Sequence, residues 1–464
     1  MLQELQQLMK ALEAGSYNAA PGTLTQGAAL QTEDLSPVME NVTWEDKHIK
    51  LQKLISKKDS KGQLIQFNRQ LDYGIFGGSA QYEGGIGEED TSSYVRAVVP
   101  MSYYSTVRRV SVAANMISAF DGVKAEDRSA DDAAKKIAGD IEFDLFQGQA
   151  HFSNAGMFDG NPLAIAAMPN MVGVDTQVRQ SDMLANTQDL MFAEYGSSES
   201  VVLPVNGTLT QGIIEDAAVR NSLNHGNADK LYMDPVALSA YNKIAFSKER
   251  IHLAGSAQEA TGAQLRTQWV SSGSVSLESS NFLRGKARPA RARAGSPTAP
   301  ATVTATAGVA AGALIPAGAY IYTVTAVNER GESVESAPVS HTVATLGDKV
   351  TLSIPAVTAA KYFNVYRTKA GQTVAQQAKF IGRVKASGVG ATAFTDLGNK
   401  SPGFTTAYLI QADTLGMHQL APFSRLKLAV SDLSLPEASF QFICLAAYQP
   451  RKNVLLDNVN GQIS

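Results

Sequence analysis

The stretch DRSADDAAKKIAGDIEFDLFQ, residues 127–147, carries the clearest periodic pattern of the 464-residue sequence. Its apolar residues recur at helical spacing and predict a single helix, about 30 Å long at ~1.5 Å per residue. The predicted apolar stripe consists of Ala134, Ile137, Ala138, Ile141 and Leu145. Ser129 with Asp132 predicts a capping-box start, and Gly148 predicts the end of the helix.

Two alternating segments precede this helix. Residues from Gln63 place Ile65, Phe67 and Leu71 on one side of a strand, and a second alternating run spans Tyr94–Val112. Together they predict a long two-stranded ribbon. The six glycines between Gly74 and Thr91 predict a tip that becomes ordered only against another molecule. The candidate subunit-contact residues at this tip are Gly77, Gly78, Tyr82, Gly84, Gly85, Glu88 and Glu89.

The region after the helix has mixed α and β character. Thr210–Leu223 predicts an amphipathic helix ended by Gly226, and Lys230–Met233 predicts a strand. Asp234-Pro235 then predicts an N-cap followed by proline at the first position of another helix.

A sharp change in composition follows near Lys286. Basic residues alternate with Ala and Pro up to Arg293, which predicts a linker, and residues 299–405 read as several short strands. Such a series of strands predicts an all-β sandwich. A buried sheet is predicted after this block by the strand patterns Leu426–Val430, Phe440–Ala447 and Val454–Leu456. The sandwich is therefore expected to be inserted within another domain.

Composition limits the possible functions. The length predicts two or three domains, and the 44% apolar and 18% charged residues predict a folded chain. A net charge of −3 disfavours nucleic-acid binding as the main task. Cys444 is the single cysteine and lies in an apolar run, so we expect a buried thiol. Met1–Glu13 predicts an amphipathic helix rather than an export signal, and no stretch reaches the ~18 apolar residues of a membrane span.

No pattern typical of an active site occurs. The glycine-rich segment lacks the Lys-Ser/Thr of a phosphate-binding loop, and the six histidines are too scattered to predict a zinc site. The acidic runs Glu88-Glu89-Asp90 and Asp131-Asp132 fit a loop tip and a helix start. We therefore expect no enzyme, cofactor or metal. The basic run Lys286–Arg293 predicts a solvated hinge, with nucleic-acid contact as the lesser alternative.

The order of arm, ribbon, long helix, mixed α/β region and returning strands resembles the major capsid proteins of tailed phages with the Hong Kong 97-like fold. The resemblance covers residues 1–285 and 406–464 and implies an α+β protein whose ribbon lies over a neighbouring subunit. The inserted block resembles fibronectin type III and other immunoglobulin-like domains of phage structural proteins. That second resemblance rests on Tyr320–Asn328, Gly331-Glu332-Ser333, Val365-Tyr366-Arg367 and Phe394-Thr395-Asp396.

The sequence departs from this family pattern at two places. Some members cross-link covalently through a lysine of the extended loop, but no lysine occurs between Gly62 and Val123. Some begin with a helical scaffold segment of about one hundred residues, for which a ribbon starting near Gly62 leaves no room. The resemblance therefore implies a separate scaffolding protein and no lysine cross-link.

The resemblance implies a specific division of the chain. The expected parts are an N-terminal arm (1–61), an extended β-ribbon loop (62–112), a peripheral domain (113–161 and 406–464) with its spine helix at 127–147, an axial domain (162–285), a linker (286–298) and the inserted immunoglobulin-like domain (299–405). Assembly in the bacterial cytoplasm into hexamers and pentamers of a DNA-filled icosahedral virion shell is expected, with a portal as a further partner. The inserted domain is expected to face outward, where it contacts host-surface glycans.

Three alternatives remain open. A phage tail tube or baseplate protein can also carry immunoglobulin-like insertions, although the long helix argues against it. A glycan-binding adhesin would use the sandwich for recognition, but the sequence shows no export signal. An enzyme with an accessory sandwich lacks any candidate catalytic residues.

Overall fold

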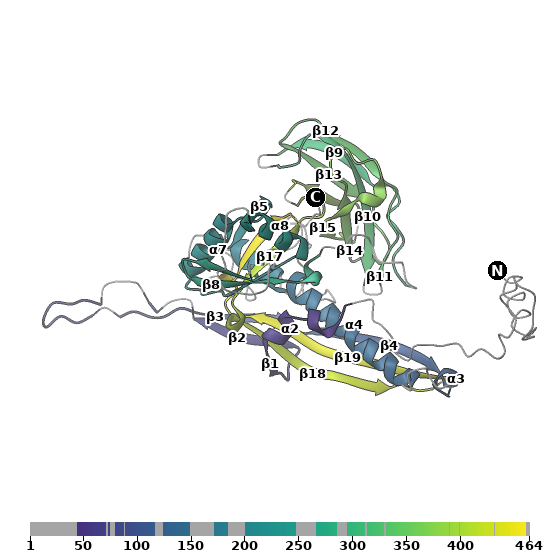
Figure 1. Cartoon of the computed structure of the whole chain (residues 1–464), viewed down its shortest axis with the longest axis horizontal. Coiled ribbons are helices and arrows are strands. Elements are labelled where there is room, and N and C mark those ends of the chain that lie inside the picture. The colour runs from purple at the N-terminus through teal and green to yellow at the C-terminus, as the bar shows by residue number, and fades with distance from the viewer. Residues whose placement is uncertain are drawn as a thin grey trace, which may run out of the picture.

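The computed structural model describes residues 44–70, 73–74, 79–87, 89–116, 124–148, 171–183, 200–246, 266–284, 295–310, 313–328, 331–388, 390–398, 400–430 and 432–460. Within them the chain forms a four-stranded sheet under a long helix, a six-stranded sheet, a projecting two-stranded ribbon and a block of two further sheets (Figure 1). The predicted arm up to residue 43, and residues 286–294 of the predicted linker, lie outside the described residues.

The predicted long helix is confirmed as α4 (Ala125–Gln147). Its N-cap is Lys124, whose side chain makes no capping hydrogen bond, so the capping box predicted at Ser129 and Asp132 is wrong. Glu126 and Asp127 occupy the first turn instead, where the helix dipole favours acids. Gly148 ends the helix as predicted, and a Cβ there would lie 2.2 Å from the carbonyl oxygen of Met171.

Helix α4 packs on a four-stranded sheet. The strand order is β1 (Ser56–Asp59), β18 (Leu415–Lys427), β19 (Ser434–Ala447) and β4 (Ser102–Ser111). Strand β19 joins β4 to β18 by antiparallel pairing, although β4 and β19 are more than three hundred residues apart in the sequence. The short elements beside this unit are η2 (Asp46–His48), α2 (Leu51–Leu54) and α3 (Val112–Met116).

The ribbon consists of β2 (Leu64–Gln70) and β3 (Tyr94–Pro100), paired antiparallel from Leu64↔Pro100 to Gln70↔Tyr94. The prediction that the ribbon continues to Val112 is wrong, because Ser102–Ser111 is β4 of the four-stranded sheet. The alternation of buried and exposed side chains shifts by one residue at this junction, because the consecutive residues Met101 and Ser102 are both buried. A period of two predicts a strand but cannot show where its pairing partner changes.

A six-stranded sheet lies beside the four-stranded one. Its strand order is β5 (Val202–Gly207), β20 (Val454–Val459), β17 (Thr405–Ile410), β6 (Lys230–Met233), β8 (Gly273–Ser279) and β7 (Thr267–Val270). The accompanying helices are α6 (Val174–Met183), α7 (Gln211–Leu223), α8 (Pro235–Phe246), η3 (Asn281–Leu283), η5 (Ala412–Thr414) and η6 (Pro450–Lys452). The predicted strand Val454–Leu456 is confirmed within β20, but its placement in one sheet with Phe440–Ala447 is wrong, since β20 pairs with β5 and β17.

The predicted helix boundaries in this region are borne out in part. Pro235 is the first residue of α8, and a carboxylate oxygen of Asp234 accepts the Val236 N–H at 3.2 Å, which confirms the predicted cap. Helix α7 is capped by Asn224 rather than ended by Gly226, because the left-handed turn falls on His225, with φ 58°.

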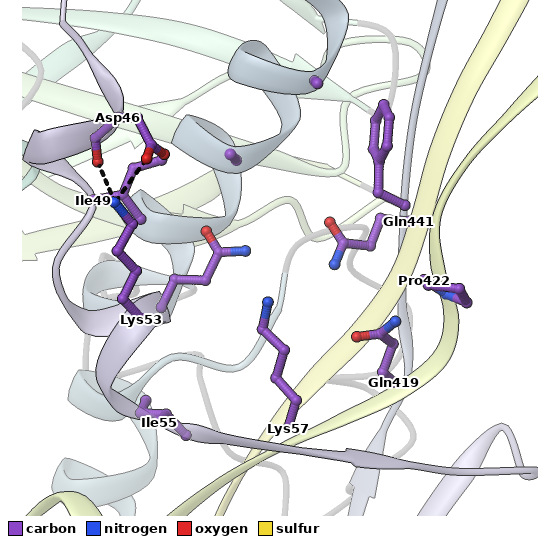
Figure 2. A pocket seen from close by; sticks show the side chains of 12 residues that line it. Asp46, Ile49, Lys53, Ile55, Lys57, Gln419, Pro422 and Gln441 are labelled. Carbon is purple, nitrogen blue, oxygen red and sulfur yellow. Dashed lines mark hydrogen bonds and ion pairs between the residues drawn. The ribbon is translucent and has the colours of Figure 1, made fainter. Parts of the chain in front are cut away.

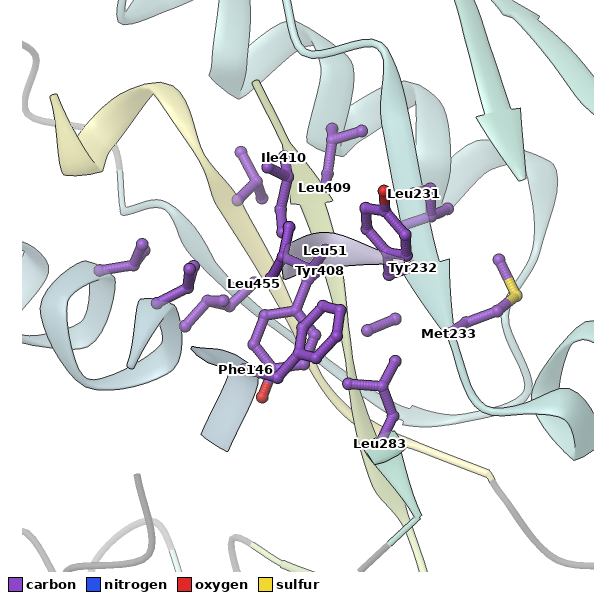
Figure 3. Close-up of a cluster of buried hydrophobic side chains, with 14 of the residues drawn as sticks. Leu51, Phe146, Leu231, Tyr232, Met233, Leu283, Tyr408, Leu409, Ile410 and Leu455 are labelled. Carbon is purple, nitrogen blue, oxygen red and sulfur yellow. The ribbon is translucent and has the colours of Figure 1, made fainter. Parts of the chain in front are cut away.

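One hydrophobic core joins α4 to the six-stranded sheet (Figure 3). Its aromatic centre is Phe146 at the end of α4, whose ring centroid lies 5.4 Å from those of Tyr232 on β6 and Tyr408 on β17. The Tyr408 hydroxyl is satisfied by donating to Asp175 at 3.2 Å. Because these side chains come from both units, the helix and the two sheets are fixed to each other.

The block after Gly295 is all-β. Its elements are β9 (Thr304–Val309), β10 (Gly318–Asn328), β11 (Gly331–Glu332), β12 (Val339–Val343), β13 (Asp348–Ile354), β14 (Tyr362–Arg367), η4 (Ala375–Gln377), β15 (Lys379–Lys385) and β16 (Thr392–Asp396). They form a five-stranded and a three-stranded sheet that share a core of their own, including Tyr322, Leu352 and Phe363. Buried Arg367 pairs with Asp396 across the two sheets.

Candidate subunit-contact surface

The ribbon projects away from the rest of the chain (Figure 1). At its tip, Tyr82 is 95% exposed and Ile86 is 93% exposed. Two large apolar side chains so fully exposed on a narrow ribbon are typical of a surface that another protein covers. The predicted tip residues Gly84, Gly85 and Glu89 are exposed here too, whereas Gly77, Gly78 and Glu88 lie outside the described residues.

The base of the ribbon is fixed, in contrast to its tip. Ile65 on β2 and Val99 on β3 pack against Cys444 and Ala446 of β19 in a small core. Buried Arg69 adds hydrogen bonds from Nη2 to the Ala447 carbonyl and from Nε to the Tyr448 carbonyl, both at 2.8 Å. The ribbon is therefore held at one end and presented to solvent at the other.

The buried thiol predicted for Cys444 is confirmed, because its side chain is fully buried under the ribbon. Burial raises the pKa of this thiol to about 12. Nearby, burial and the charge of Lys58 lower the pKa of His418, whose Nε2 lies 2.9 Å from the Tyr448 hydroxyl. Within the described ranges, no group of three His, Cys, Asp or Glu side chains could hold a metal ion, and no helix there is long and apolar enough to cross a membrane.

An apolar face of the four-stranded sheet is only partly covered. Cys444 and Ala446 lie under the ribbon, but Phe440 and Phe442, which share their side of β19, extend beyond it. Their rings lie 5.2 Å apart, and Tyr103 of β4 stacks edge-on at 4.9 Å from Phe442. We call the face formed by Tyr103, Val107, Leu426, Phe440 and Phe442 the open sheet face.

The far end of this sheet is also apolar and exposed. The prediction of a buried strand at Leu426–Val430 is wrong: β18 ends at Lys427, and the exposed fractions of Leu426 and Val430 are 56% and 60%. Leu433 and Met116 beside them are more than 80% exposed. The apolar pattern in the sequence marked these residues, but it could not show that nothing within the described chain covers them.

A groove of about 700 Å³ opens on the opposite side of the sheet, between α2, α4, β1 and β18 (Figure 2). Its apolar lining includes Ile49, Ile55, Pro422 and Phe423, and Ala134 and Ala138 of the predicted helix stripe also line it. The polar lining residues are Asp46, Gln52, Lys53, Lys57, Gln419 and Gln441. No sequence pattern predicted this groove, since its walls come from three distant parts of the chain.

No family model matches the chain. It is 23% identical over 469 residues to the major capsid protein of Staphylococcus phage K, covering 97% of this chain and 94% of that protein. It is 22% identical over 474 residues to the putative major capsid protein of Enterococcus phage phiEF24C, covering 98% and 95%. The solved capsid of a native GTA particle covers 96% of this chain and is itself covered completely, with a TM-score of 0.48 and 12% identity.

The match to these sequence relatives extends almost from end to end of the chain. The chain is similar to phage major capsid proteins, which are structural proteins and not enzymes.

Proposed function

We propose that this chain is the major capsid protein of a tailed bacteriophage with the Hong Kong 97-like fold. Its copies form the hexamers and pentamers of an icosahedral shell that encloses double-stranded DNA without reading its sequence. The end-to-end similarity to phage major capsid proteins carries this proposal.

The surface described above supports repeated contact between copies. No described residue of the chain covers Tyr82 or Ile86 on the ribbon, and Tyr103 on the open sheet face is 49% exposed. Stable assemblies bury such apolar surface between subunits. In this proposal the ribbon is the extended loop, α4 with the four-stranded sheet is the peripheral domain, and the six-stranded sheet is the axial domain.

The all-β block has a separate role in the proposal. It is an inserted immunoglobulin-like domain that stands on the outer surface and contacts host-surface glycans. Its two-sheet arrangement and its own hydrophobic core support this assignment. A scaffolding protein and a portal are separate chains that act during assembly in the bacterial cytoplasm.

Electron microscopy of the purified chain, with light scattering after size exclusion, tests the shell proposal. The chain is expressed alone and together with a separate scaffolding protein. Closed shells or rings of five and six subunits are the expected result. Stacked rings or tubes would instead assign the chain to a phage tail, and a monomer under both conditions would overturn self-assembly.

A further inference from the structure

We propose that a single peptide group clamps the all-β block to the six-stranded sheet, so that the block is a rigid projection rather than a tethered domain. This group is the bond between Lys400 and Ser401, in the segment that leads from β16 to β17. The composition of residues 286–298 predicts a linker at the other connection, but a block held at its exit cannot swing freely about its entry. The inference goes beyond the proposed function and does not depend on it, because both partners of the clamp belong to one chain.

The two polar groups of this peptide bind to different parts of the chain. The Lys400 carbonyl accepts a hydrogen bond from Nη2 of Arg367, on β14 of the block, at 2.9 Å. The Ser401 N–H donates to Oδ1 of Asn458, on β20 of the six-stranded sheet, at 2.8 Å. A trans peptide is planar and directs its C=O and N–H in opposite directions. No freely rotating bond therefore separates the group that the block holds from the group that the sheet holds.

The partner on the side of the block, Arg367, is itself fixed. Its side chain is buried, and its guanidinium forms an ion pair with Asp396 at the end of β16. The Asp396 carboxylate also accepts the Tyr322 hydroxyl at 3.0 Å and the Gly398 N–H at 2.8 Å. Since β10, β14 and β16 all contribute to this network, the position of the Lys400 carbonyl is set by the core of the block.

The partner on the side of the sheet, Asn458, is directed by an irregularity in β20. The pairing register of β20 with β5 shifts between Asp457 and Val459, and Asn458 between them has the left-handed φ of 58°. Asparagine tolerates this conformation, and a bulge of this kind redirects a side chain out of the regular ladder. The Asn458 amide also donates to Oδ1 of Asn206 on β5 at 2.6 Å. The sheet therefore holds the acceptor of the Ser401 N–H in place.

The backbone on either side of the clamped peptide is held as well. Before it, the Leu397 carbonyl accepts the Leu314 N–H at 2.7 Å within the block. After it, the Phe404 N–H donates to the Ser401 carbonyl at 3.0 Å, directly before β17 begins at Thr405. The block can therefore turn against the sheet only if a hydrogen bond of the clamp breaks. In the proposed shell, every copy would present the block in the same orientation.

Limited proteolysis of the full chain tests the clamp, because trypsin cleaves after lysine and the clamped bond follows Lys400. Trypsin must bind the carbonyl of the bond that it cleaves in its own oxyanion hole, and Arg367 already binds this carbonyl. Asn458→Gly removes the acceptor of the Ser401 N–H but still permits the left-handed backbone. The rate of cleavage between Lys400 and Ser401, followed by mass spectrometry of the fragments, should rise many-fold in this variant.

Two matched variants separate the clamp from a general loss of stability. Asn458→Asp keeps an acceptor oxygen for the Ser401 N–H and tolerates the same backbone, so it should retain the native resistance. His225→Gly changes a residue with the same φ of 58° at the end of α7, away from the clamp, and should also leave the rate unchanged. Rapid cleavage after Lys400 in the native chain, or equal rates in Asn458→Gly and Asn458→Asp, would overturn the clamp.

Electron spin resonance measures the orientation of the block directly. Nitroxide labels are placed on Ser353→Cys, exposed on β13 of the block, and on Val219→Cys, exposed on α7. Native Cys444 stays unlabelled because it is fully buried, and dilution with unlabelled chain limits the signal to pairs within one copy. One narrow distance distribution is expected, and adding Asn458→Gly should broaden it several-fold. A broad distribution without that substitution, or a narrow one that Asn458→Gly leaves unchanged, would contradict the rigid mount, whether or not the chain forms shells.

Discussion

The buried carboxylate of Glu142 on α4 accepts the backbone N–H of Gln52 at 2.8 Å. The same carboxylate accepts the N–H groups of Leu51, at 2.8 Å, and Lys50, at 3.0 Å. These are free N–H groups at the start of α2, which no earlier turn of helix can satisfy. One side chain of the long helix therefore fixes the segment that leads into β1 and forms one wall of the groove.

Glu142→Gln should lower the free energy of unfolding by roughly 1–3 kcal/mol, because an amide replaces a buried acceptor of three hydrogen bonds and turns an NH₂ group toward backbone donors. Urea denaturation measures the change. Asp131→Asn, on an exposed position of the same helix, is the control and should cost much less. An equal loss of unfolding free energy in the two variants would show that the three hydrogen bonds of Glu142 add no stability.

Gly139→Ala should release Trp44 from α4. A Cβ at this glycine would lie 2.6 Å from the Trp44 indole, so the ring must move although alanine favours helix. We expect lower stability and a red-shifted tryptophan emission, since the second tryptophan, Trp269, is already 77% exposed. Gly212→Ala in the first turn of α7 meets no atom within 4 Å and should leave the emission unchanged. A stabilised Gly139→Ala variant with native emission would contradict this packing.

The stability of the chain should fall at acid pH through Asp457. Its carboxylate accepts Arg179 Nη1 at 3.0 Å and the Thr406 hydroxyl at 2.9 Å, and the charge of Arg179 lowers the pKa of Asp457 against the effect of burial. A lowered pKa stabilises the fold above the ordinary aspartate pKa of about 4, and this contribution is lost as the pH falls below that value.

Thermal unfolding measured between pH 6 and pH 3 tests whether stability falls with acid. This range of about 3 units spans the ordinary aspartate pKa. Asp457→Asn should be less stable than the native chain at the upper end and should depend less on pH. Exposed Asp131→Asn serves as the control. An Asp457→Asn variant with the full native pH dependence would assign the acid sensitivity to other groups.

The Cys444 thiol should be inert in the folded protein. Its full burial under the ribbon base and its pKa of about 12 keep it protonated and inaccessible near neutral pH. A disulfide reagent added at pH 8, well below that pKa, should label less than one tenth of the native chains and nearly all chains in denaturant. Rapid native labelling would mean that the ribbon base opens easily.

The sequence by itself determined several local elements of this protein. The apolar period of residues 127–147 predicted α4, alternation predicted the paired strands β2 and β3, and Asp234-Pro235 predicted the start of α8. An apolar run also predicted the burial of Cys444. These features depend on residues close together in the chain, so their spacing carries the information.

Only the tertiary structure decided how these elements meet. A period of two shows which side of a strand is apolar but not its partner, so the sequence could not place Ser102–Ser111 against β19 or β20 beside β5. The groove and the hydrogen bonds of Glu142 form where segments near residues 50 and 140 meet distant parts of the chain. The open sheet face forms where β4 and β18 pair with β19. Such surfaces form only when long-range packing fixes the neighbours, and spacing along the sequence does not encode them.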